Sequence, residues 1–468
     1  MIQFLLNNEI IQTELPPGMT VLDFVRYRKS LTGTKCGCRE GDCGACTVLI
    51  GTPEGEELRY RSMTSCLTPL GNVQGKHVVT VEGINPLQDK VLTPVQQAMV
   101  DASGTQCGFC TVGFVMSLTG FLIQKTEPDF DKAIAAIDGN ICRCTGYKSI
   151  ERAAQALTDL LQSRGEQTTL DFAIAQQIVP EYFATIPARL KALSQTQAAP
   201  ADGKAQFVGG GTDLYVQRHE DMVYASAQHL FDDAHLHGIR EVEGFIEVGA
   251  AATVTDLWES PLMQDLFPDL RKHLKLVSST PIRNMATLAG NLVNASPIGD
   301  MTVWLLALDA TIVLANGQKR ELPLRDLYLG YKSLDKTADE VLETIRFRKP
   351  VGEYHFNFEK VCKRTHLDIA SVNAAIFLQT QDDHITEAHA AIGGVAAIPL
   401  YLKKTAAFLK GKALPKTADL NDPLLAEACA ILQSEISPIS DVRGSADYKR
   451  LLAQQLFLAH FEHITQQV

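Results

Sequence analysis

The sequence predicts a chain of several α+β domains, and three observations support this fold class. The chain has 468 residues, about three times a common domain length, so three or four folded units are expected. Short runs with the alternation of strands occur together with runs that have the apolar spacing of helices. Nine of the eleven cysteines lie in the first 150 residues, which sets the N-terminal third apart from the rest.

The composition is that of an ordinary globular chain. Hydrophobic residues make up 46% and charged residues 21% of the sequence, which excludes disorder as the main state. The 43 basic and 54 acidic residues give a net charge of −11, which would repel nucleic-acid phosphates. No apolar run approaches the roughly 18 residues of a membrane span, and the opening MIQFLLNNEI does not resemble a secretory leader. We therefore expect a cytoplasmic protein that binds neither nucleic acid nor membrane.

The first set of cysteines follows two strand-like segments and ends with a fourth cysteine further along the chain. Cys38, Cys43 and Cys46 form C-x4-C-x2-C, with Cys66 further on, which is the plant-type ferredoxin spacing for a [2Fe-2S] cluster. Glycines alternate with the cysteines in GCREGDCGAC, so the loop can turn its N–H groups toward cluster sulfurs. The flanking QFLLN, EIIQTEL and MTVLDFVRYR predict a small sheet packed on one helix. A four-cysteine zinc site is the alternative, although zinc usually takes two C-x2-C-like knuckles.

The second set of cysteines lies among predicted helices. Cys107 and Cys110 form C-x2-C, and Cys142 and Cys144 form C-x-C. Helices are expected from Pro94, over TVGFVMSLTGFLIQK, over 128–138 and from Ser149 onward. Each cysteine pair therefore precedes a helix start, where free N–H groups and the positive end of the helix dipole favour an anionic cluster. Zinc is again the alternative, although a C-x-C pair is unusual for it.

The third region begins near Tyr182. FVGGGTDLYV places a glycine cluster between two strand-like runs, a form that allows close approach of backbone to a pyrophosphate. Leu214 stands where a Rossmann fingerprint has its third glycine, and an ordinary tight turn has the same pattern. STPIRNMATLAGNLVNASPIGD is rich in polar residues yet lies between two apolar helices. Polar groups at that depth need partners.

Taken together, the cysteine motifs resemble those of the molybdenum hydroxylase family, which includes xanthine dehydrogenases and aldehyde oxidases. QCGFCTVGFVM and GNICRCTGY are similar to one of its two [2Fe-2S] domains, and TGTKCGCREGDCGACTV with TSCL is similar to the other. Cys36 stands where the family commonly has an apolar residue, and we interpret it as a small buried hydrophobe. The resemblance implies eight cluster ligands, which are Cys38, Cys43, Cys46, Cys66, Cys107, Cys110, Cys142 and Cys144.

The polar segment and the glycine cluster resemble the FAD-binding elements of the same family. Ala289 replaces a usual glycine and adds a methyl group close to the expected cofactor. The resemblance implies FAD contacts in the glycine turn, in the polar segment and at two later positions, namely at Phe207, Val208, Gly209, Gly210, Gly211, Thr212, Asp213, Leu214, Thr287, Asn291, Asp300, Leu342 and Lys360.

The resemblance also implies an α+β multidomain organisation, in five parts. They are a β-grasp, ferredoxin-like [2Fe-2S] domain over 1–83, a four-helix [2Fe-2S] domain over 84–162, a linker over 163–178, a two-part α+β FAD-binding domain of the vanillyl-alcohol-oxidase type over 179–350 and an α+β C-terminal flavoprotein domain over 351–468.

An electron-transfer role follows from the resemblance. In the family, substrate is hydroxylated at a molybdenum-pterin centre on a separate large domain, and no residues remain here to build one. We therefore expect the catalytic residues on a large partner subunit, in a heterotetramer of two small and two large chains. Electrons would pass through the helical-domain cluster and the ferredoxin-like cluster to FAD and then to NAD.

The substrate is expected to be hypoxanthine or xanthine, oxidised to urate. Two alternatives stay open. One is the same type of subunit serving another N-heterocycle hydroxylase or an aldehyde hydroxylase, and the other is a non-enzymatic metal-binding redox sensor without flavin. The groups that choose the substrate lie outside this chain, so its sequence does not identify the substrate.

Overall fold

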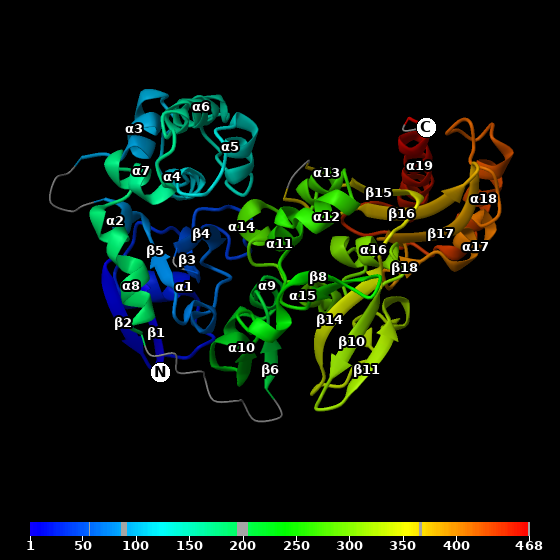
Figure 1. Cartoon of the computed structure of the whole chain (residues 1–468), viewed down its shortest axis with the longest axis horizontal. Helices are drawn as coiled ribbons and strands as arrows, with labels where there is room; N and C mark the ends of the chain where they lie inside the picture. The colour runs from blue at the N-terminus through cyan, green and yellow to red at the C-terminus, as the bar shows by residue number, and fades with distance from the viewer. Residues whose placement is uncertain (56, 86–90, 194–204, 365–366, 467–468) are drawn as a thin grey trace. The chain divides into compact units, whose positions relative to one another are not determined.

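The computed structural model describes residues 1–55, 57–85, 91–193, 205–364 and 367–466, which form two compact units. The first unit contains Met1–Phe231 and Ser279–Ala286, and the second contains Asp232–Ser278 and Thr287–Val468. Helices and sheets occur in both units (Figure 1), which confirms the predicted α+β class. None of the helices in the described ranges is long and apolar enough to cross a membrane.

The N-terminal sheet of the first unit has the strand order β2-β1-β5-β3-β4. Strand β1 pairs antiparallel with β2 and parallel with β5, and β3 forms a hairpin with β4. Alternate side chains of β3 enter two different cores, because successive residues of a strand point to opposite faces. The strands are β1 (Ile2–Leu6), β2 (Glu9–Thr13), β3 (Thr47–Glu54), β4 (Glu57–Thr64) and β5 (His77–Val79).

One face of this sheet is covered by the helical segment expected from MTVLDFVRYR. The segment begins as α1 (Val21–Asp23), capped by the Thr20 hydroxyl, and continues as a π-helix over Phe24–Arg28. Its apolar residues pack with β1 and β3 in one core. Cys36 is half-buried against the same core, so it packs as a small hydrophobe that is not fully enclosed.

The other face of the sheet packs on the four helices predicted around the second cysteine set. The first of them begins at a Thr93 capping box followed by Pro94, as the sequence indicated. All four contribute to one core together with residues of β3 and β5. The helices are α3 (Pro94–Asp101), α4 (Thr111–Leu122), α5 (Phe130–Ala136) and α6 (Lys148–Gln162).

The segment 163–178, expected as a linker, contains a helix that belongs to this core. Helix α7 (Thr169–Ala175) starts at the Thr168 cap and buries Phe172 and Ala173 completely. The 3-10 turn Glu181–Thr185 and the short helix α8 (Ile186–Lys191) follow it in the chain, and another short helix, α2 (Val81–Ile84), precedes α3. The polar residues at the start of this segment gave no indication in the sequence of the apolar face that Phe172 and Ala173 form.

The glycine cluster lies between a strand and a helix. Strand β6 (Gln206–Val208) pairs in parallel with β7 (Ala227–His229), whereas the run after the glycines folds as α9 (Leu214–Gln217), followed by α10 (His219–Tyr224). The expectation of a second strand was wrong. Tyr215 is fully buried in the N-terminal core and its N–H donates to the Gly211 carbonyl, so tertiary packing overrides the strand-like composition.

The second unit contains two larger sheets. One has the order β11-β10-β14-β9-β8 and the other the order β15-β16-β17-β18, with the two-stranded β12-β13 ladder besides. Helix α19 packs on β15 and β16 (Figure 1). The strands are β8 (Ile239–Val242), β9 (Phe245–Gly249), β10 (Thr311–Ala315), β11 (Lys319–Pro323), β12 (Tyr328–Gly330), β13 (Ser333–Leu334), β14 (Val341–Arg348), β15 (Glu353–Val361), β16 (Val372–Gln381), β17 (His384–Gly393) and β18 (Leu400–Tyr401).

Helices supply the rest of the cores in this unit. The polar segment 279–300 is partly helical, because it contains α14 (Thr280–Arg283, in the first unit), α15 and the start of α16. The helices of the second unit are α11 (Val254–Glu259), α12 (Pro261–Leu266), α13 (Leu270–Lys275), α15 (Leu288–Asn294), α16 (Asp300–Leu306), α17 (Lys403–Leu409), α18 (Pro423–Glu435) and α19 (Ala446–Thr465).

Candidate iron–sulfur and flavin sites

The four thiols of the first cysteine set come together at one end of the β3–β4 hairpin. Cys46 directly precedes β3 and Cys66 follows β4, and the Thr47–Thr64 register brings the two together. The Cys46 and Cys66 thiols lie close enough to shift each other's pKa, and so do those of Cys38 and Cys43 in the preceding loop. Cys38 also interacts electrostatically with Cys46 and Cys66.

The loop that carries Cys38 and Cys43 turns its N–H groups toward sulfur. The Cys43 thiol lowers the pKa of Cys38 to about 5, and the N–H groups of Glu40, Cys43 and Asp42 add to this effect against burial. The Glu40 N–H lies 3.3 Å from the Cys38 sulfur. Gly41 and Gly44 have φ of 78° and 65°, conformations that glycine adopts without strain. The glycine pattern thus places donors where thiolate ligands need them.

The second cysteine set gathers at the starts of two helices. Cys110 is the N-cap residue of α4, and Cys142 and Cys144 precede α6. The sulfurs of Cys107 and Cys144 are 3.9 Å apart, and Cys110 pairs with Cys142. Burial opposes ionisation of Cys142, but the Thr145 hydroxyl and N–H, at 3.1 and 3.4 Å from its sulfur, lower the pKa of this thiol.

Both sets fit a binuclear iron site better than a zinc site. Each set supplies the four cysteines that a [2Fe-2S] cluster needs. The spacings C-x4-C-x2-C and C-x-C are unusual for a zinc site. The N–H donors aimed at the sulfurs also suit a cluster that becomes more negative on reduction. The residues present therefore match the cluster type that the sequence predicted.

The two cysteine sets are joined by a direct hydrogen bond. The Ile141 N–H, in the residue before Cys142, donates to the carbonyl of Cys43 over 3.1 Å. Beside it the Asn140 side chain donates to the Gly44 carbonyl, also over 3.1 Å. A Cβ at Gly44 would lie 2.3 Å from the Gly139 carbonyl oxygen, so the two loops approach each other more closely than a larger residue allows.

The glycine turn predicted to hold a pyrophosphate lies in the first unit, against the segment that carries Cys66. A Cβ on Gly210 would lie 1.8 Å from the Met285 carbonyl oxygen, and one on Gly211, whose φ is 84°, would lie 3.0 Å from the Leu67 carbonyl oxygen. The Asn72 side chain donates to the Gly209 carbonyl over 2.8 Å. The backbone packing thus requires glycine at Gly210 and Gly211, and Leu67 directly follows Cys66, a predicted cluster ligand.

The other residues of the glycine turn lie around this contact. Phe207 and Val208 belong to β6, and Val208 is fully buried in the N-terminal core. Thr212 and Asp213 are half-buried, and the Gln217 N–H donates to the Asp213 carbonyl in the first turn of α9. The turn therefore ends in a helix, and its N–H groups precede a helix start.

The predicted flavin contacts at Thr287 and Asn291 lie in the second unit, where both side chains already have partners. The Thr287 hydroxyl accepts from the Gly290 N–H and caps α15. The Asn291 Oδ1 accepts from the N–H and hydroxyl of Thr302 in α16, each over 3.1 Å. Both residues therefore organise the polar segment itself. The Thr287 cap was recognisable in the sequence, because a threonine stands directly before a helical run.

Asp300 and Lys360, also in the second unit, come together in an ion pair. The Lys360 ammonium lies 2.7 Å from the Asp300 carboxylate, and its side chain is only 1% exposed. It also donates to the Leu276 carbonyl over 2.8 Å, while the Asn373 amide donates to the second oxygen of Asp300 over 2.6 Å. Asn373 was not predicted. Leu342 is buried in β14 opposite Leu314.

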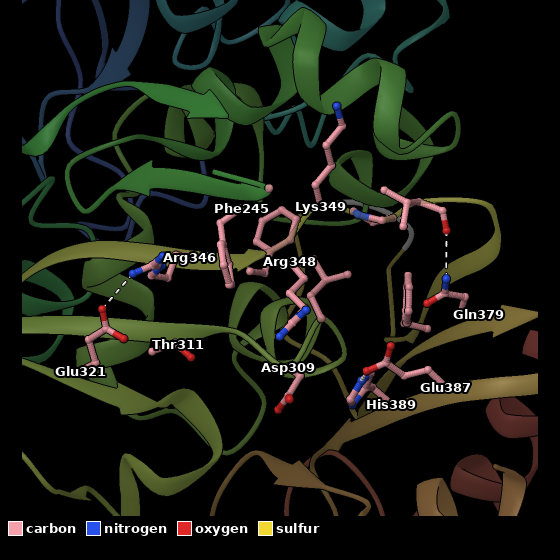
Figure 2. A pocket seen from close by; sticks show the side chains of 16 residues that line it. Phe245, Asp309, Thr311, Glu321, Arg346, Arg348, Lys349, Gln379, Glu387 and His389 are labelled. Atoms are coloured by element: carbon pink, nitrogen blue, oxygen red, sulfur yellow. Dashed lines mark hydrogen bonds and ion pairs between the residues drawn. The ribbon is translucent and has the colours of Figure 1, made fainter. Parts of the chain in front are cut away.

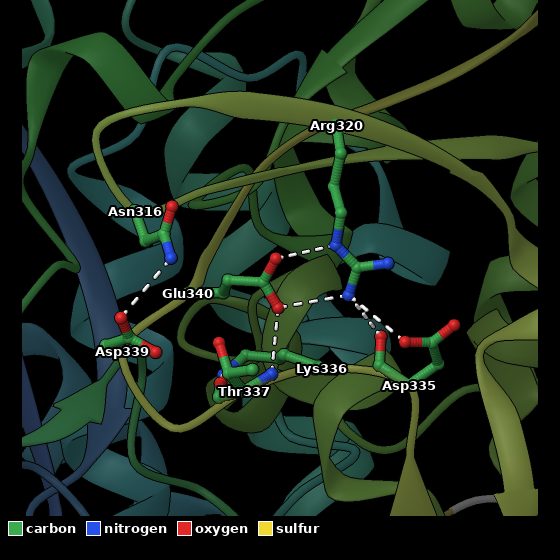
Figure 3. Close-up of polar contacts among 7 residues, drawn as sticks. All are labelled: Asn316, Arg320, Asp335, Lys336, Thr337, Asp339 and Glu340. Atoms are coloured by element: carbon green, nitrogen blue, oxygen red, sulfur yellow. Dashed lines mark hydrogen bonds and ion pairs between the residues drawn. The ribbon is translucent and has the colours of Figure 1, made fainter.

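Two further features of the second unit lie apart from these residues. Figure 2 shows a pocket of about 560 Å³ lined by residues such as Phe245, Arg348 and His389, and none of its lining residues is a predicted flavin contact. Figure 3 shows Arg320 paired with Glu340, whose pKa its hydrogen bonds lower to about 2. That pair ties β11 to the segment before β14.

Comparisons with known proteins match four family models along the chain. Residues 4–71 match the 2Fe-2S iron-sulfur cluster binding domain, and 80–155 match the [2Fe-2S] binding domain. Residues 180–349 match the FAD binding domain in molybdopterin dehydrogenase, and 358–464 match the CO dehydrogenase flavoprotein C-terminal domain. These matches confirm the predicted kinds of domain.

Curated relatives and solved structures agree with these models. A xanthine dehydrogenase of Emericella nidulans is 30% identical over all of this chain, and xanthine dehydrogenase 1 of Arabidopsis thaliana is 28% identical over 98% of it. The chain spans 39% of the length of each relative. A chain of the CO dehydrogenase from Oligotropha carboxidovorans and one of quinoline 2-oxidoreductase from Pseudomonas putida are 26% and 27% identical. Their TM-scores are 0.52 and 0.51, with 57% of this chain and 91% of each of theirs covered.

Sequence motifs, paired thiols and these comparisons therefore agree. Two [2Fe-2S] domains are followed by an FAD-binding domain and a flavoprotein C-terminal domain, in the same order as the four matched models. The chain belongs to the molybdenum hydroxylase family, and it is homologous to the N-terminal part of xanthine dehydrogenases.

Proposed function

We propose that the chain is the electron-transfer subunit of a molybdenum hydroxylase that oxidises hypoxanthine or xanthine to urate and reduces NAD. The observation that carries the proposal is the hydrogen bond from the Ile141 N–H to the Cys43 carbonyl, 3.1 Å long. It joins the residue before one cluster ligand, Cys142, to another ligand, Cys43. Electrons moving between the two iron centres therefore have a short path through the chain's own bonds.

Electrons enter this path at the helical cysteine set. The Cys107 and Cys144 thiols are exposed, and the large apolar side chains of Phe109, Ile141 and Tyr147 are exposed around them. Apolar surface beside an exposed redox ligand favours docking of a protein donor. The partner we propose is a large subunit that carries molybdenum-pterin, in a heterotetramer of two small and two large chains.

Electrons leave at the flavin. FAD, when bound, takes electrons one at a time from iron–sulfur centres and gives them up in pairs as a hydride. The glycine turn is the proposed pyrophosphate site, and the closeness of Gly211 to the Leu67 carbonyl puts the turn beside the first cysteine set. Further FAD contacts are proposed at Thr287, Asn291, Asp300, Leu342 and Lys360.

A second candidate is a hydroxylase of another N-heterocycle. The similarity to quinoline 2-oxidoreductase favours it. Xanthine is the first choice because the xanthine dehydrogenase relatives match this chain over 98–100% of its length, with both cluster domains and the flavin domains in one chain.

The proposal that this chain transfers electrons and the large subunit hydroxylates the substrate is tested with the purified chain alone. We expect it to oxidise NADH with an artificial electron acceptor, because that reaction needs only flavin, and not to form urate from xanthine. Adding the large subunit should restore reduction of NAD by xanthine. The Cys142→Ser variant should lose that turnover and keep NADH oxidation by acceptors that take electrons from flavin. Urate formation by the chain free of any partner would contradict the proposal, and a chain that retains iron but never flavin would favour a redox sensor.

A further inference from the structure

The loop of the first cysteine set carries one arginine, and this arginine is tied to distant parts of the first unit. Arg39 directly follows Cys38. Its guanidinium makes two hydrogen bonds to the Asp23 carboxylate, of 2.6 and 3.1 Å, and lies 3.0 Å from the Nε2 of His219. Asp23 lies in α1, and His219 lies at the start of α10, soon after the glycine turn. Residues far apart in sequence thus meet beside a cluster ligand.

The anchoring carboxylate is itself held in place. The buried Thr20 hydroxyl donates to Asp23 over 2.9 Å. Helix α1 is docked by the Leu22 N–H, which donates to the Ser65 carbonyl next to Cys66. The hydrogen bonds of Arg39 hold the pKa of the Asp23 carboxyl below its usual value, against partial burial. Asp23 is therefore a fixed negative charge, and Arg39 a fixed positive one, beside the first cysteine set.

Arg39 has an unusual backbone conformation that its contact with Asp23 maintains. Its φ is 61°, a left-handed conformation that is strained for a residue with a Cβ. This conformation turns the chain so that the next N–H, that of Glu40, lies 3.3 Å from the Cys38 sulfur. The bidentate contact with Asp23 offsets the backbone cost. The contact between Arg39 and Asp23 thus orients the Glu40 N–H toward the Cys38 sulfur.

We propose that Arg39 and Asp23 set the reduction potential of the iron–sulfur centre at Cys38, Cys43, Cys46 and Cys66, with opposite signs, and that Arg39 is a positioning residue of the ligand loop. The inference rests on the proposed function, because it takes a cluster at these cysteines as given. Reduction adds one negative charge to the centre. Arg39 stabilises that charge and Asp23 opposes it, since charges in a partly buried pair are screened less than those in open solvent. The exposed fractions of the two side chains are 32% and 18%.

The test is a redox titration of the full chain followed by electron paramagnetic resonance. Arg39→Gln should move the midpoint of the first centre to a lower potential, and Asp23→Asn should move it to a higher one. Arg39→Lys keeps the positive charge but cannot make the bidentate contact with Asp23. Its midpoint potential for the first centre should therefore lie between those of wild type and Arg39→Gln. The midpoint of the second centre should stay unchanged in all three variants. A matched control is Lys29→Gln, which removes one charge from a more exposed pair with Glu9 in the same unit and should move neither midpoint.

A role that is only structural would give a different result. The inference would be overturned if the midpoint potential of the first centre moved in the same direction in Arg39→Gln and Asp23→Asn. It would also be overturned if that potential did not move in variants with full iron content. If Arg39→Gln fails to hold iron, Arg39→Gly is used, because glycine adopts the left-handed conformation without cost. An unshifted midpoint in iron-replete Arg39→Gly would then overturn the proposal, and a lower midpoint would support it. A wild-type chain with no iron–sulfur signal would instead contradict the proposed function.

Discussion

Replacement of Asp300 by alanine should destabilise the second unit severely. The substitution leaves the Lys360 ammonium, whose side chain is 1% exposed, with the Leu276 carbonyl as its remaining hydrogen-bond partner in the described structure. Removing one partner of a buried ion pair costs about 3–5 kcal/mol. For a unit of this size each kcal/mol lowers the unfolding midpoint by about 2–4 °C, so a decrease of roughly 6–20 °C is expected.

Tryptophan fluorescence provides a selective assay. Both tryptophans of the chain, Trp258 and Trp304, lie in the second unit, so their emission reports the unfolding of that unit. The control is Glu241→Ala, which breaks a half-exposed pair with Lys349 and should cost no more than about 1 kcal/mol. Flavin release is followed in the same samples.

A double variant separates the ion pair from other effects of Asp300. Asp300→Ala with Lys360→Met removes the uncompensated charge, so it should recover a large part of the lost stability. Flavin retention should recover with it if loss of fold causes flavin loss, and should stay low if the carboxylate contacts flavin directly. An Asp300→Ala midpoint within about 2 °C of wild type, or a double variant as unstable as the single one, would refute the reasoning.

Three other perturbations have distinct expected outcomes. Cys43→Ser and Cys142→Ser should each remove one iron–sulfur signal and leave the other, by iron analysis and electron paramagnetic resonance, and loss of both signals from either change would contradict separate sites. Burial lowers the pKa of His273 to about 4 and that of His460 to about 3, so below pH of about 6.5 the unfolded chain binds protons that the folded chain does not. Stability of the second unit should therefore fall by about 2 kcal/mol per histidine at pH 5, measured by denaturant unfolding, and a flat profile between pH 7 and pH 5 would refute this. Gly210→Ala should lose flavin on dialysis, because its Cβ would lie 1.8 Å from a carbonyl oxygen, and normal flavin content would contradict the close packing.

The sequence predicted what depends on local spacing. The predicted ligands Cys38, Cys43 and Cys46 lie within nine residues of one another, so their geometry is determined by one loop. The helix start at Thr93 was equally readable, because the cap and the following Pro94 act within a single turn. Such features need no knowledge of the tertiary fold.

What the sequence did not predict depends on distant partners. The run after Gly211 looked like a strand, yet burial of Tyr215 in the N-terminal core makes it helical. Asn291 looked like a ligand contact because it is polar among apolar helices, and its observed partner is Thr302. The meeting of Arg39 with His219, which lie 180 residues apart, has no signal in motif spacing at all.

The same limit applies to the polar segment between 279 and 300. The resemblance to the family's FAD-binding elements predicts flavin contacts at its polar residues. Thr287 instead caps a helix and Asp300 pairs with Lys360. Flavin binding at these positions therefore remains a proposal, and it has to be measured separately from their effect on stability.

We propose that one chain carries two iron–sulfur centres and a flavin that exchange electrons. This is tested by anaerobic addition of NADH to the purified chain, with flavin absorbance and electron paramagnetic resonance recorded on the same sample. We expect the flavin to bleach and both [2Fe-2S] signals to appear, whereas in Cys43→Ser the remaining signal should develop much more slowly, because the first centre no longer relays electrons. Bleaching of flavin with both clusters left oxidised, or an unchanged rate of second-centre reduction in Cys43→Ser, would contradict the claim.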